Sequence, residues 1–327
     1  MSTKIDIISG FLGSGKTTLI KKLLSEMLSS EKVVIIENEF GEIGIDGGIL
    51  KDSGIQIREI NAGCICCTLL GNFDAALKDV LKKYHPDRVI IEPSGVGKLS
   101  DITAACQKVI AQSDSEINIQ AVIVDPIKYK MYIKNFSEFY SNQIECAKTI
   151  ILSRTQKIDQ AKLSEVVNDI RKCNPSAKIM TTPWEELSAQ TILAAAEETG
   201  STPLIQQEEA FESVHHHGHC TEHGHGHCNC EGHHHADDVF ENWGMETPHL
   251  FSEEQIKNML KKLSESEKYG TVLRAKGILP VSEKNWVQFD FVPEEFELHP
   301  IAPDYTGRLC VIGVNLNRPA LAELFGV

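Results

Sequence analysis

One segment constrains the fold of this chain more than any other. Residues 10–17 read Gly-Phe-Leu-Gly-Ser-Gly-Lys-Thr and match the phosphate-binding signature G-x-x-x-x-G-K-[ST]. They follow an apolar run of strand length, Lys4–Ser9, and precede an amphipathic helical pattern at Thr18–Leu24. Glycines let backbone N–H groups close around phosphate oxygens, where side chains would collide. The sequence therefore predicts a strand, a glycine loop and a helix that bind a nucleoside triphosphate.

Two side chains at the end of this loop have predicted roles. Lys16 supplies positive charge to the outer phosphates, and the hydroxyl of Thr17 is an expected ligand of Mg²⁺. The positive end of the following helix adds to the attraction for phosphate. The expected nucleotide-binding residues of this segment are Gly10, Gly13, Ser14, Gly15, Lys16, Thr17 and Thr18.

The charge composition argues against a nucleic acid or an anionic membrane as a partner. The chain has 46 acidic and 32 basic residues, so a broad positive surface is not expected. No apolar stretch approaches the roughly twenty residues that cross a bilayer, and the first strand lacks the basic n-region of a signal peptide. Six of the ten cysteines lie in two clusters, which is typical of metal binding in a reducing compartment. We therefore expect a cytoplasmic protein.

Strand and helix patterns alternate along the first two thirds of the chain. Further strand-length apolar runs occur at Val33–Ile36, Arg88–Ile91, Ile117–Val124, Thr149–Leu152 and Lys178–Met180. Helical patterns lie between them at Phe73–Tyr84, Leu99–Gln112 and Gln160–Lys172. This alternation predicts an α/β fold, a P-loop NTPase with a mostly parallel sheet that helices cover on both faces.

The chain is predicted to contain two folded domains. The nucleotide-binding domain is expected at 1–205, a disordered His/Cys-rich metal-binding linker at 206–245 and a small α+β domain at 246–327. Within the linker, Val214–Ala236 contains ten histidines, three cysteines and almost nothing that could pack in a core. An expression tag is the alternative, although tags are usually terminal and rarely interleaved with Cys and Glu.

The small C-terminal domain has its own local signals. Ser252-Glu253-Glu254-Gln255 is a capping box that predicts the start of an amphipathic helix. Strand-like runs and a final short helix are expected at Thr271–Arg274, Trp286–Val292, Arg308–Val314 and Pro319–Phe325.

Two acidic segments are candidates for chemistry near the phosphates. Glu92 ends an apolar strand three residues before Gly95, so its carboxylate can hold Mg²⁺ while the Gly95 N–H senses the γ-phosphate. A loop that changes with phosphate state is expected at 37–46, where Glu39 is the candidate to position water or Mg²⁺. The alternatives are a structural carboxylate at Glu92 and an acidic, solvated loop at 37–46. The predicted catalytic residues are Lys16, Glu39 and Glu92.

A metal site is predicted at Gly63-Cys64-Ile65-Cys66-Cys67. Three thiols within four residues can converge on one soft ion, and Zn²⁺ takes four tetrahedral ligands. The fourth ligand could be water, a thiolate from elsewhere, Glu37 or Glu42. A disulfide within the motif, or inert buried cysteines, are the alternatives.

Further metal ligands and isolated thiols are distinguished by their spacing. The isolated cysteines Cys106, Cys146, Cys173 and Cys310 are expected to be small core residues. The candidate metal ligands of the linker are His215, His216, His217, His219, Cys220, His223, His225, His227, Cys228, Cys230, His233, His234 and His235.

The motifs together resemble one family. GFLGSGKTT, ENEFGEIGID, GCICC and EPSG, in this order, are similar to those of the CobW-like GTPases, relatives of the urease and hydrogenase nickel-insertion GTPases. YGTVLRAKGIL and RLCVIGVNL resemble parts of that family's C-terminal domain. The resemblance implies Mg²⁺-dependent GTP hydrolysis coupled to delivery of a metal, often zinc and sometimes cobalt, to a client protein. It makes the three clustered cysteines the transferable-metal site, and related GTPases often act as homodimers.

The segment expected to recognise the base departs from the family pattern. The family has Asn-Lys-x-Asp after a strand, whereas this chain has Ser153-Arg154-Thr155-Gln156. Arg154 can lie over the base, but the Gln156 amide is uncharged and cannot accept two hydrogen bonds as a carboxylate does. Asp159 could substitute if the loop is shifted. GTP is the expected substrate, with ATP as the alternative.

The function expected from these features is GTP-dependent metal delivery. In this hypothesis the triphosphate orders the 37–46 loop and brings Glu37 and Glu42 toward the three cysteines, and hydrolysis then releases the ion. Thiolates and imidazoles favour Zn²⁺ or Cu⁺, and Co²⁺ or Ni²⁺ also fit such ligands. The alternatives are a zinc buffer or metal sensor with only structural nucleotide binding, and a small-molecule kinase, which leaves the GCICC motif unexplained.

Overall fold

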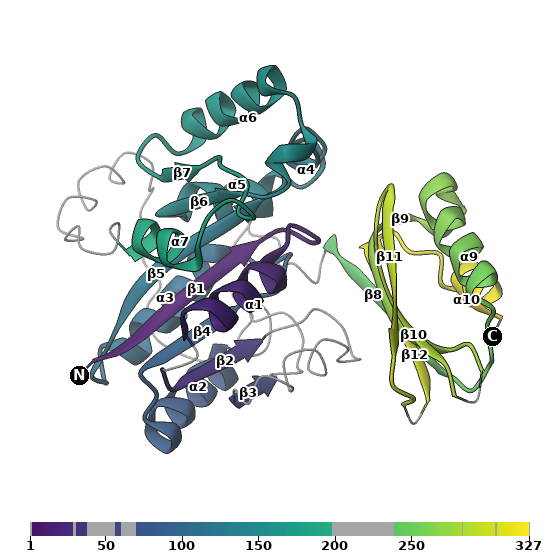
Figure 1. Ribbon diagram of the computed structural model, residues 1–327, viewed down its shortest axis with the longest axis horizontal. Helices are drawn as coiled ribbons and strands as arrows, with labels where there is room; N and C mark the ends of the chain where they lie inside the picture. Colours follow the sequence, from purple (N-terminus) through teal and green to yellow (C-terminus); the bar gives the residue numbers. More distant parts are fainter. Residues whose placement is uncertain are drawn as a thin grey trace, which may run out of the picture.

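The computed structural model describes residues 2–28, 31–37, 56–59, 70–197, 239–282, 284–304 and 306–326. Within these ranges the chain forms two sheets, one in each half of the molecule (Figure 1).

The first sheet has seven strands in the order β3-β2-β4-β1-β5-β6-β7, and every neighbouring pair is parallel. The predicted parallel sheet is therefore confirmed. The edge strand β3 was not predicted because its sequence, Gln-Ile-Arg-Glu, contains only one apolar residue. The strands are β1 (Thr3–Gly10), β2 (Val33–Glu37), β3 (Gln56–Glu59), β4 (Arg88–Glu92), β5 (Ser115–Val124), β6 (Thr149–Leu152) and β7 (Lys178–Met180).

Helices cover both faces of this sheet. Ile90 and Ile91 of β4 point to opposite faces, as successive strand residues must, and they enter two separate apolar clusters. One cluster packs under α1 and α7, and the other packs under α2 to α6 (Figure 1). The helices are α1 (Lys16–Glu26), α2 (Leu70–Tyr84), α3 (Leu99–Ile110), α4 (Tyr129–Asn135), α5 (Ser137–Cys146), α6 (Gln160–Cys173) and α7 (Ala189–Glu197).

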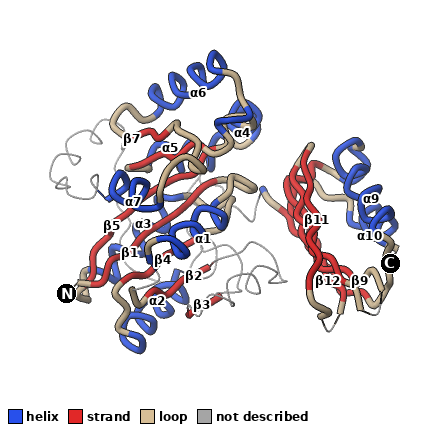
Figure 2. The backbone as a smooth tube through the Cα atoms, in the orientation of Figure 1, coloured by secondary structure: helices blue, strands red, loops and turns tan. Residues whose placement is uncertain are grey.

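The second sheet has five antiparallel strands in the order β11-β10-β9-β12-β8, and two helices cover one of its faces (Figure 2). Ser252 forms the predicted capping box with Gln255 at the start of the first of these helices. The elements are β8 (Glu241–Thr247), α9 (Glu253–Glu265), β9 (Thr271–Pro280), β10 (Trp286–Val292), β11 (Glu295–Ile301), β12 (Gly307–Val314) and α10 (Arg318–Phe325).

The strand β8 begins inside the segment that we predicted as linker, 206–245. Its residues pair along their whole length with β12, so this stretch belongs to the C-terminal sheet. Its side chains alternate only weakly between buried and exposed positions, and the pattern Glu-Asn-Trp-Gly-Met-Glu-Thr gives little strand signal.

The two halves of the chain share apolar contacts. On β9, Val272 and Leu279 pack with the C-terminal helices, whereas Leu273 and Ile278 join the core of the N-terminal domain. Phe240, just before β8, is buried in that same core with its ring 5.2 Å from the ring of Phe139. Part of the outer face of the C-terminal sheet therefore packs against the N-terminal domain.

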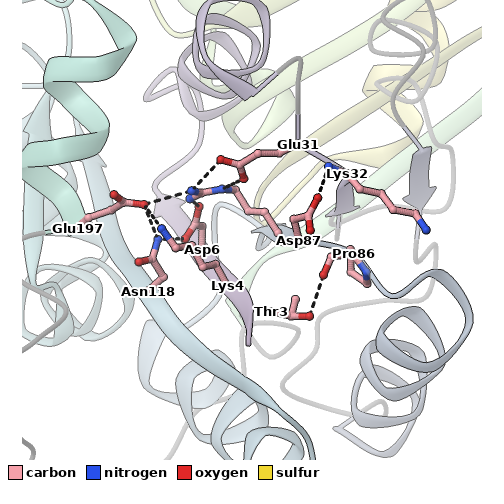
Figure 3. A network of polar contacts seen from close by, with 10 residues as sticks. Thr3, Lys4, Asp6, Glu31, Lys32, Pro86, Asp87, Asn118 and Glu197 are labelled. Carbon is pink, nitrogen blue, oxygen red and sulfur yellow. Dashed lines mark hydrogen bonds and ion pairs between the residues drawn. The ribbon is translucent and has the colours of Figure 1, made fainter. Parts of the chain in front are cut away.

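An ionic network closes the amino edge of the parallel sheet (Figure 3). The Arg88 side chain of β4 is 3% exposed and donates to carboxylates of Asp6, Glu31 and Glu197. Asn118 of β5 donates to Asp6 at 2.8 Å and to Glu197 at 3.0 Å. These contacts connect β1, β4, β5 and α7, on the side of the sheet opposite the glycine loop.

No helix within the described ranges is long and apolar enough to cross a bilayer.

Candidate functional site at the carboxyl edge of the parallel sheet

The glycine loop joins β1 to α1 at the carboxyl edge of the sheet. Gly13 and Gly15 have φ values of 69° and 102°, a region that residues with a Cβ rarely adopt. At Gly15 a Cβ would also come within 3.0 Å of the Trp184 ring. The local geometry therefore requires glycine, and the first N–H groups of α1 remain at the end of the loop, where an anion can be bound.

The predicted phosphate-binding lysine lies over this loop. Lys16 is buried, and its Nζ donates to the carbonyl of Gly10 at 3.0 Å. The ammonium group is therefore held beside the loop. There it can donate to a phosphate oxygen in place of the Gly10 carbonyl.

Thr17 and Glu92 meet across the loop from α1 and β4. The Thr17 Oγ1 donates to the Glu92 Oε1 at 2.9 Å. A hydroxyl oxygen and a carboxylate oxygen beside a phosphate loop form the hard, oxygen-only ligand set that Mg²⁺ prefers. The residues present therefore fit this cation.

Three neighbouring strands end in glutamate at this edge. In the register of β2 and β4, Glu37 lies opposite Glu92, and in that of β2 and β3 it lies opposite Glu59. The Glu37 side chain is 4% exposed. The two predicted carboxylates, one assigned to Mg²⁺ and the other to the transferable metal, thus start from adjacent positions on adjacent strands.

Gly95 lies against the glycine loop. A Cβ on Gly95 would come within 2.9 Å of the Leu12 backbone nitrogen, so only glycine allows this approach. The carbonyls of Gly95 and Gly97 accept from Gln143 Nε2 at 3.2 and 2.8 Å, which holds the turn after β4 in place. Gln143 was not predicted, because a glutamine inside a helix gives no signal in sequence.

The segment after β6 also contacts the glycine loop. Arg154 has a φ of 52°, and its guanidinium donates to the carbonyl of Gly13 and to Asp125, both at 2.9 Å. Asp125 is 2% exposed and follows β5 directly. Sequence reasoning did not identify it, although a carboxylate after an apolar strand and before Pro126 is a usable signal.

The other residues considered for base recognition have different environments. Gln156 is exposed, and its Nε2 lies 3.4 Å from the Glu185 carboxylate. Asp159 accepts from the Lys162 N–H at 2.9 Å and so caps α6, with its pKa lowered mainly by that hydrogen bond. A carboxylate committed to a helix cap is not free to turn toward a base.

A cleft of about 490 Å³ opens between the glycine loop and the C-terminal sheet. The glycine loop and the C-terminal sheet approach each other closely here, because a Cβ on Gly13 would come within 2.5 Å of Val292 Cγ1. Its walls from the N-terminal domain include Lys16, Thr17, Lys21, Glu92 and Arg154, and its walls from the C-terminal domain include Arg274, Gln288, Asp290, Glu295, Glu297 and His299.

Glu295 connects the two domains at the rim of this cleft. Its carboxylate lies 3.1 Å from Lys157 Nζ and 3.6 Å from Arg154 Nε. Partial burial alone would raise the pKa of Glu295, but the Lys157 hydrogen bond and the charges of Arg154 and Lys128 outweigh it and leave the pKa below its ordinary value. Burial lowers the pKa of Lys128 despite the nearby Asp125 carboxylate.

The isolated cysteines behave as predicted. Cys106 and Cys310 are buried and Cys146 and Cys173 are partly buried, and all four belong to or pack against the core of the N-terminal domain. Burial raises the pKa of the Cys106 thiol to about 12, so it stays protonated and is a poor metal ligand.

Most of the predicted metal ligands lie outside the described residues. In the described ranges, no group of three or more His, Cys, Asp or Glu side chains is arranged to hold a metal ion. The predicted residues outside these ranges are Glu39, Glu42, Cys64, Cys66, Cys67, His215, His216, His217, His219, Cys220, His223, His225, His227, Cys228, Cys230, His233, His234 and His235.

Both halves of the chain match known family models. Residues 4–181 match the CobW/HypB/UreG nucleotide-binding domain, and residues 240–326 match the C-terminal domain of the cobalamin synthesis protein cobW. The second match begins at the buried Phe240, one residue before β8.

Several characterised proteins are similar in sequence. The zinc chaperone YeiR of Escherichia coli is 34% identical over 155 residues, which cover 47% of this chain and 47% of YeiR. The zinc chaperone CobW of Sinorhizobium sp is 29% identical over 192 residues, so the chain matches about half of that protein too, 54% of its length. The zinc-regulated GTPase metalloprotein activator 1 of Schizosaccharomyces pombe is 25% identical over 342 residues, which cover 96% of this chain and 83% of that protein.

Among solved structures, the Zn(II)-bound YjiA GTPase from E. coli aligns with a TM-score of 0.45 and 18% identity, covering 100% of this chain and 98% of that one.

Proposed function

The chain belongs to the CobW/HypB/UreG nucleotide-binding family, and from this premise we propose that it is a GTP-hydrolysing metallochaperone. It binds Zn²⁺ at Cys64, Cys66 and Cys67 and delivers the ion to a client protein. The observation that carries the proposal is the register of β2 and β4, in which Glu37 lies opposite Glu92 at the carboxyl edge. The predicted metal segment therefore starts beside the predicted Mg²⁺ ligand.

The relatives support the metal and the nucleotide. YeiR and CobW are named zinc chaperones, and the fission-yeast relative is named a zinc-regulated GTPase metalloprotein activator. The last alignment spans 96% of this chain and includes both domains. A client that requires a metal is the partner that such an activator implies.

In the proposed reaction, water attacks the γ-phosphorus of GTP while the bond to the β–γ bridging oxygen breaks, giving GDP and phosphate. Lys16 and the N–H groups of the glycine loop offset the charge of the phosphate oxygens. Mg²⁺, held through Thr17 and Glu92, would neutralise further charge. Glu39 is proposed to orient the attacking water.

Chain connectivity supports coupling between nucleotide and zinc. Glu39 and Glu42 follow the end of β2 by two and five residues, and Cys64 follows the end of β3 by five residues. The two segments start from neighbouring strands, where Glu37 lies opposite Glu59. We expect the segment that begins at Glu37 to respond both to the γ-phosphate and to the ion at the cysteines.

Zinc is the proposed cargo, with Co²⁺ and Ni²⁺ as ions that the same ligands accept. A thiolate trio with a carboxylate provides four ligands, which suits tetrahedral Zn²⁺. The His/Cys-rich segment at 214–236 is proposed to collect the ion before it passes to the cysteines.

Nucleotide turnover measured with and without each ion tests this proposal. GTP should be hydrolysed slowly, and Zn²⁺ should change the rate by several-fold at saturating Mg²⁺. A Cys66→Ala variant should lose that response and keep nucleotide binding, whereas a Cys106→Ala variant, which alters a buried thiol of the core, should keep both. If no ion changes the rate of GTP hydrolysis, the alternative of a zinc buffer with structurally bound nucleotide is favoured instead.

A further inference from the structure

We propose that Glu185 recognises the guanine base, in place of the aspartate that the chain lacks. The inference rests on the proposed function, because it deepens the choice of GTP as substrate. It assigns a specificity role to a residue in the loop between β7 and α7, a segment to which no role was given above.

The topology fixes where a base would lie. The phosphates belong at the end of β1, and the strands that follow on one side are β5, β6 and β7. Ligands of open α/β sheets extend along the carboxyl ends of the strands. Because Arg154, two residues after β6, already contacts Gly13 of the glycine loop, the far end of the nucleotide meets the loops that follow β6 and β7.

The loop after β7 is held firmly beside the glycine loop. Trp184 is 7% exposed, packs in the apolar cluster under α1 and α7, and lies against Gly15. The Leu187 N–H donates to the Trp184 carbonyl at 3.3 Å, and the Ala189 N–H donates to Glu26 of α1 at 2.9 Å. Trp184 is buried, whereas the next residue, Glu185, is exposed to solvent.

This arrangement brings two polar side chains together from separate loops. Gln156 Nε2 and Glu185 Oε1 are 3.4 Å apart, which is longer than a usual N–H···O hydrogen bond. Both side chains are exposed. A ligand can therefore replace this weak mutual contact with better hydrogen bonds of its own.

The pair is complementary to guanine. The edge of guanine presents a carbonyl oxygen, an N1–H and an exocyclic amine in a row. The Gln156 amide can donate to the oxygen, and the two carboxylate oxygens of Glu185 can accept from the N–H groups. Adenine presents an amine and an unprotonated N1 instead. Its amine would face the donor group of Gln156, and its N1 lone pair would face the Glu185 carboxylate, so both contacts would be unfavourable.

The proposal also accounts for the departure at Gln156. The substitution removes a carboxylate from the segment after β6, and the structure supplies one from the next loop, at contact distance. No pattern in the sequence connects these residues, because they are 29 positions apart.

Calorimetric titration of the full-length protein with GTP, XTP and ATP, all in Mg²⁺, tests the proposal. Glu185→Gln should weaken GTP binding by about tenfold to a hundredfold, since a hydrogen bond to a charged acceptor is replaced by one to a neutral amide. The same variant should strengthen XTP binding, because xanthine has a carbonyl where guanine has the amine and can accept from the new amide. ATP binding should not weaken, because the carboxylate that is removed faced only the lone pair of the adenine N1.

Glu186→Gln is the matched control, because it removes the neighbouring exposed carboxylate of the same loop. It should leave all three affinities as in the wild type. A Glu185→Gln protein that binds GTP as the wild type does, or that loses all three nucleotides equally, would overturn the assignment. A wild-type protein that binds no GTP would count against the proposed function itself.

Discussion

The two edges of the parallel sheet carry ionic clusters of opposite character. At the amino edge, Arg88 is 3% exposed and its partner Asp6 is 2% exposed, and the whole network lies within one domain. At the carboxyl edge, Arg154 is 24% exposed, and Glu295, its partner across the cleft, is 34% exposed. The first cluster has a buried ion pair at its centre with partly exposed groups around it, and the second borders a cleft between domains.

This difference indicates which charged groups can change partners when a ligand binds. Arg88 cannot lose its contact with Asp6 without leaving a buried charge unpaired, so this contact is structural. The groups of the carboxyl edge lie beside a cleft of about 490 Å³, where phosphate, water or a base can replace a protein partner. Binding and regulation are therefore expected at the carboxyl edge and stability at the amino edge.

The largest effect is expected from Arg88→Ala. Removing one member of a buried ion pair typically costs about 3–5 kcal/mol, and here the Asp6 carboxylate would stay buried with only the Asn118 hydrogen bond to compensate it. Chemical denaturation should show this loss in the free energy of unfolding. Lys4→Ala, which removes an exposed member of the same network, should cost under about 1 kcal/mol, and equal losses for both would contradict the comparison.

Thr17→Ala should have the opposite effect to Arg88→Ala, because it should reduce activity and leave stability almost unchanged. We expect GTP turnover to fall by about a hundredfold or more, because a Mg²⁺ ligand beside the phosphates is lost. The free energy of unfolding should change by less than about 1 kcal/mol. Steady-state kinetics and denaturation on the same preparation check both parts. Ser25→Ala, which removes an exposed hydroxyl farther along α1, is the control, and unchanged turnover in Thr17→Ala would refute the assignment of Thr17.

Glu295→Gln should have a smaller effect that depends on salt. Contacts of partly exposed ion pairs contribute about 1 kcal/mol or less and are screened by added salt. Hydrogen exchange in β10 and β11 should become faster in low salt and match the wild type in high salt. Glu297→Gln removes a carboxylate that pairs with His299 of its own strand, so it should leave this exchange unchanged.

The same contact should depend weakly on pH. Since the pKa of Glu295 lies below its ordinary value of 4.5, its contribution is complete above that value and is lost as the pH falls through the lower folded-state pKa. Hydrogen exchange of the interface, once corrected for intrinsic rates, should therefore be constant from neutral pH down to the ordinary value of 4.5 and increase only below it. An increase already near pH 6 would point to another group.

Sequence patterns predicted the parallel sheet because each central strand is a continuous apolar run. Val33–Ile36 and Arg88–Ile91, for example, reappear as β2 and β4. The glycine loop was also predictable, since its spacing is fixed by phosphate geometry. The short strand β3 was missed because an edge strand needs few apolar residues, and β8 was missed because its pairing with β12 is a long-range contact.

The site was predicted only where residues are close in sequence. Lys16 and Thr17 follow from the loop itself, and Glu92 from its place after a strand. Gln143 was missed because it reaches the turn after β4 from another element, α5, whereas Asp125 could have been found from its place after β5 and before Pro126. Tertiary contacts of this kind depend on strand order, which no local pattern contains.

The central claim is that the nucleotide and zinc sites are coupled across the carboxyl edge. The most direct measurement is the Zn²⁺ affinity of the full-length protein with GDP and with a non-hydrolysable GTP analogue. The account predicts affinities that differ by about tenfold, a coupling free energy of about 1.4 kcal/mol, with the same factor for the analogue measured with and without Zn²⁺. Equal zinc affinities in the two nucleotide states would contradict it.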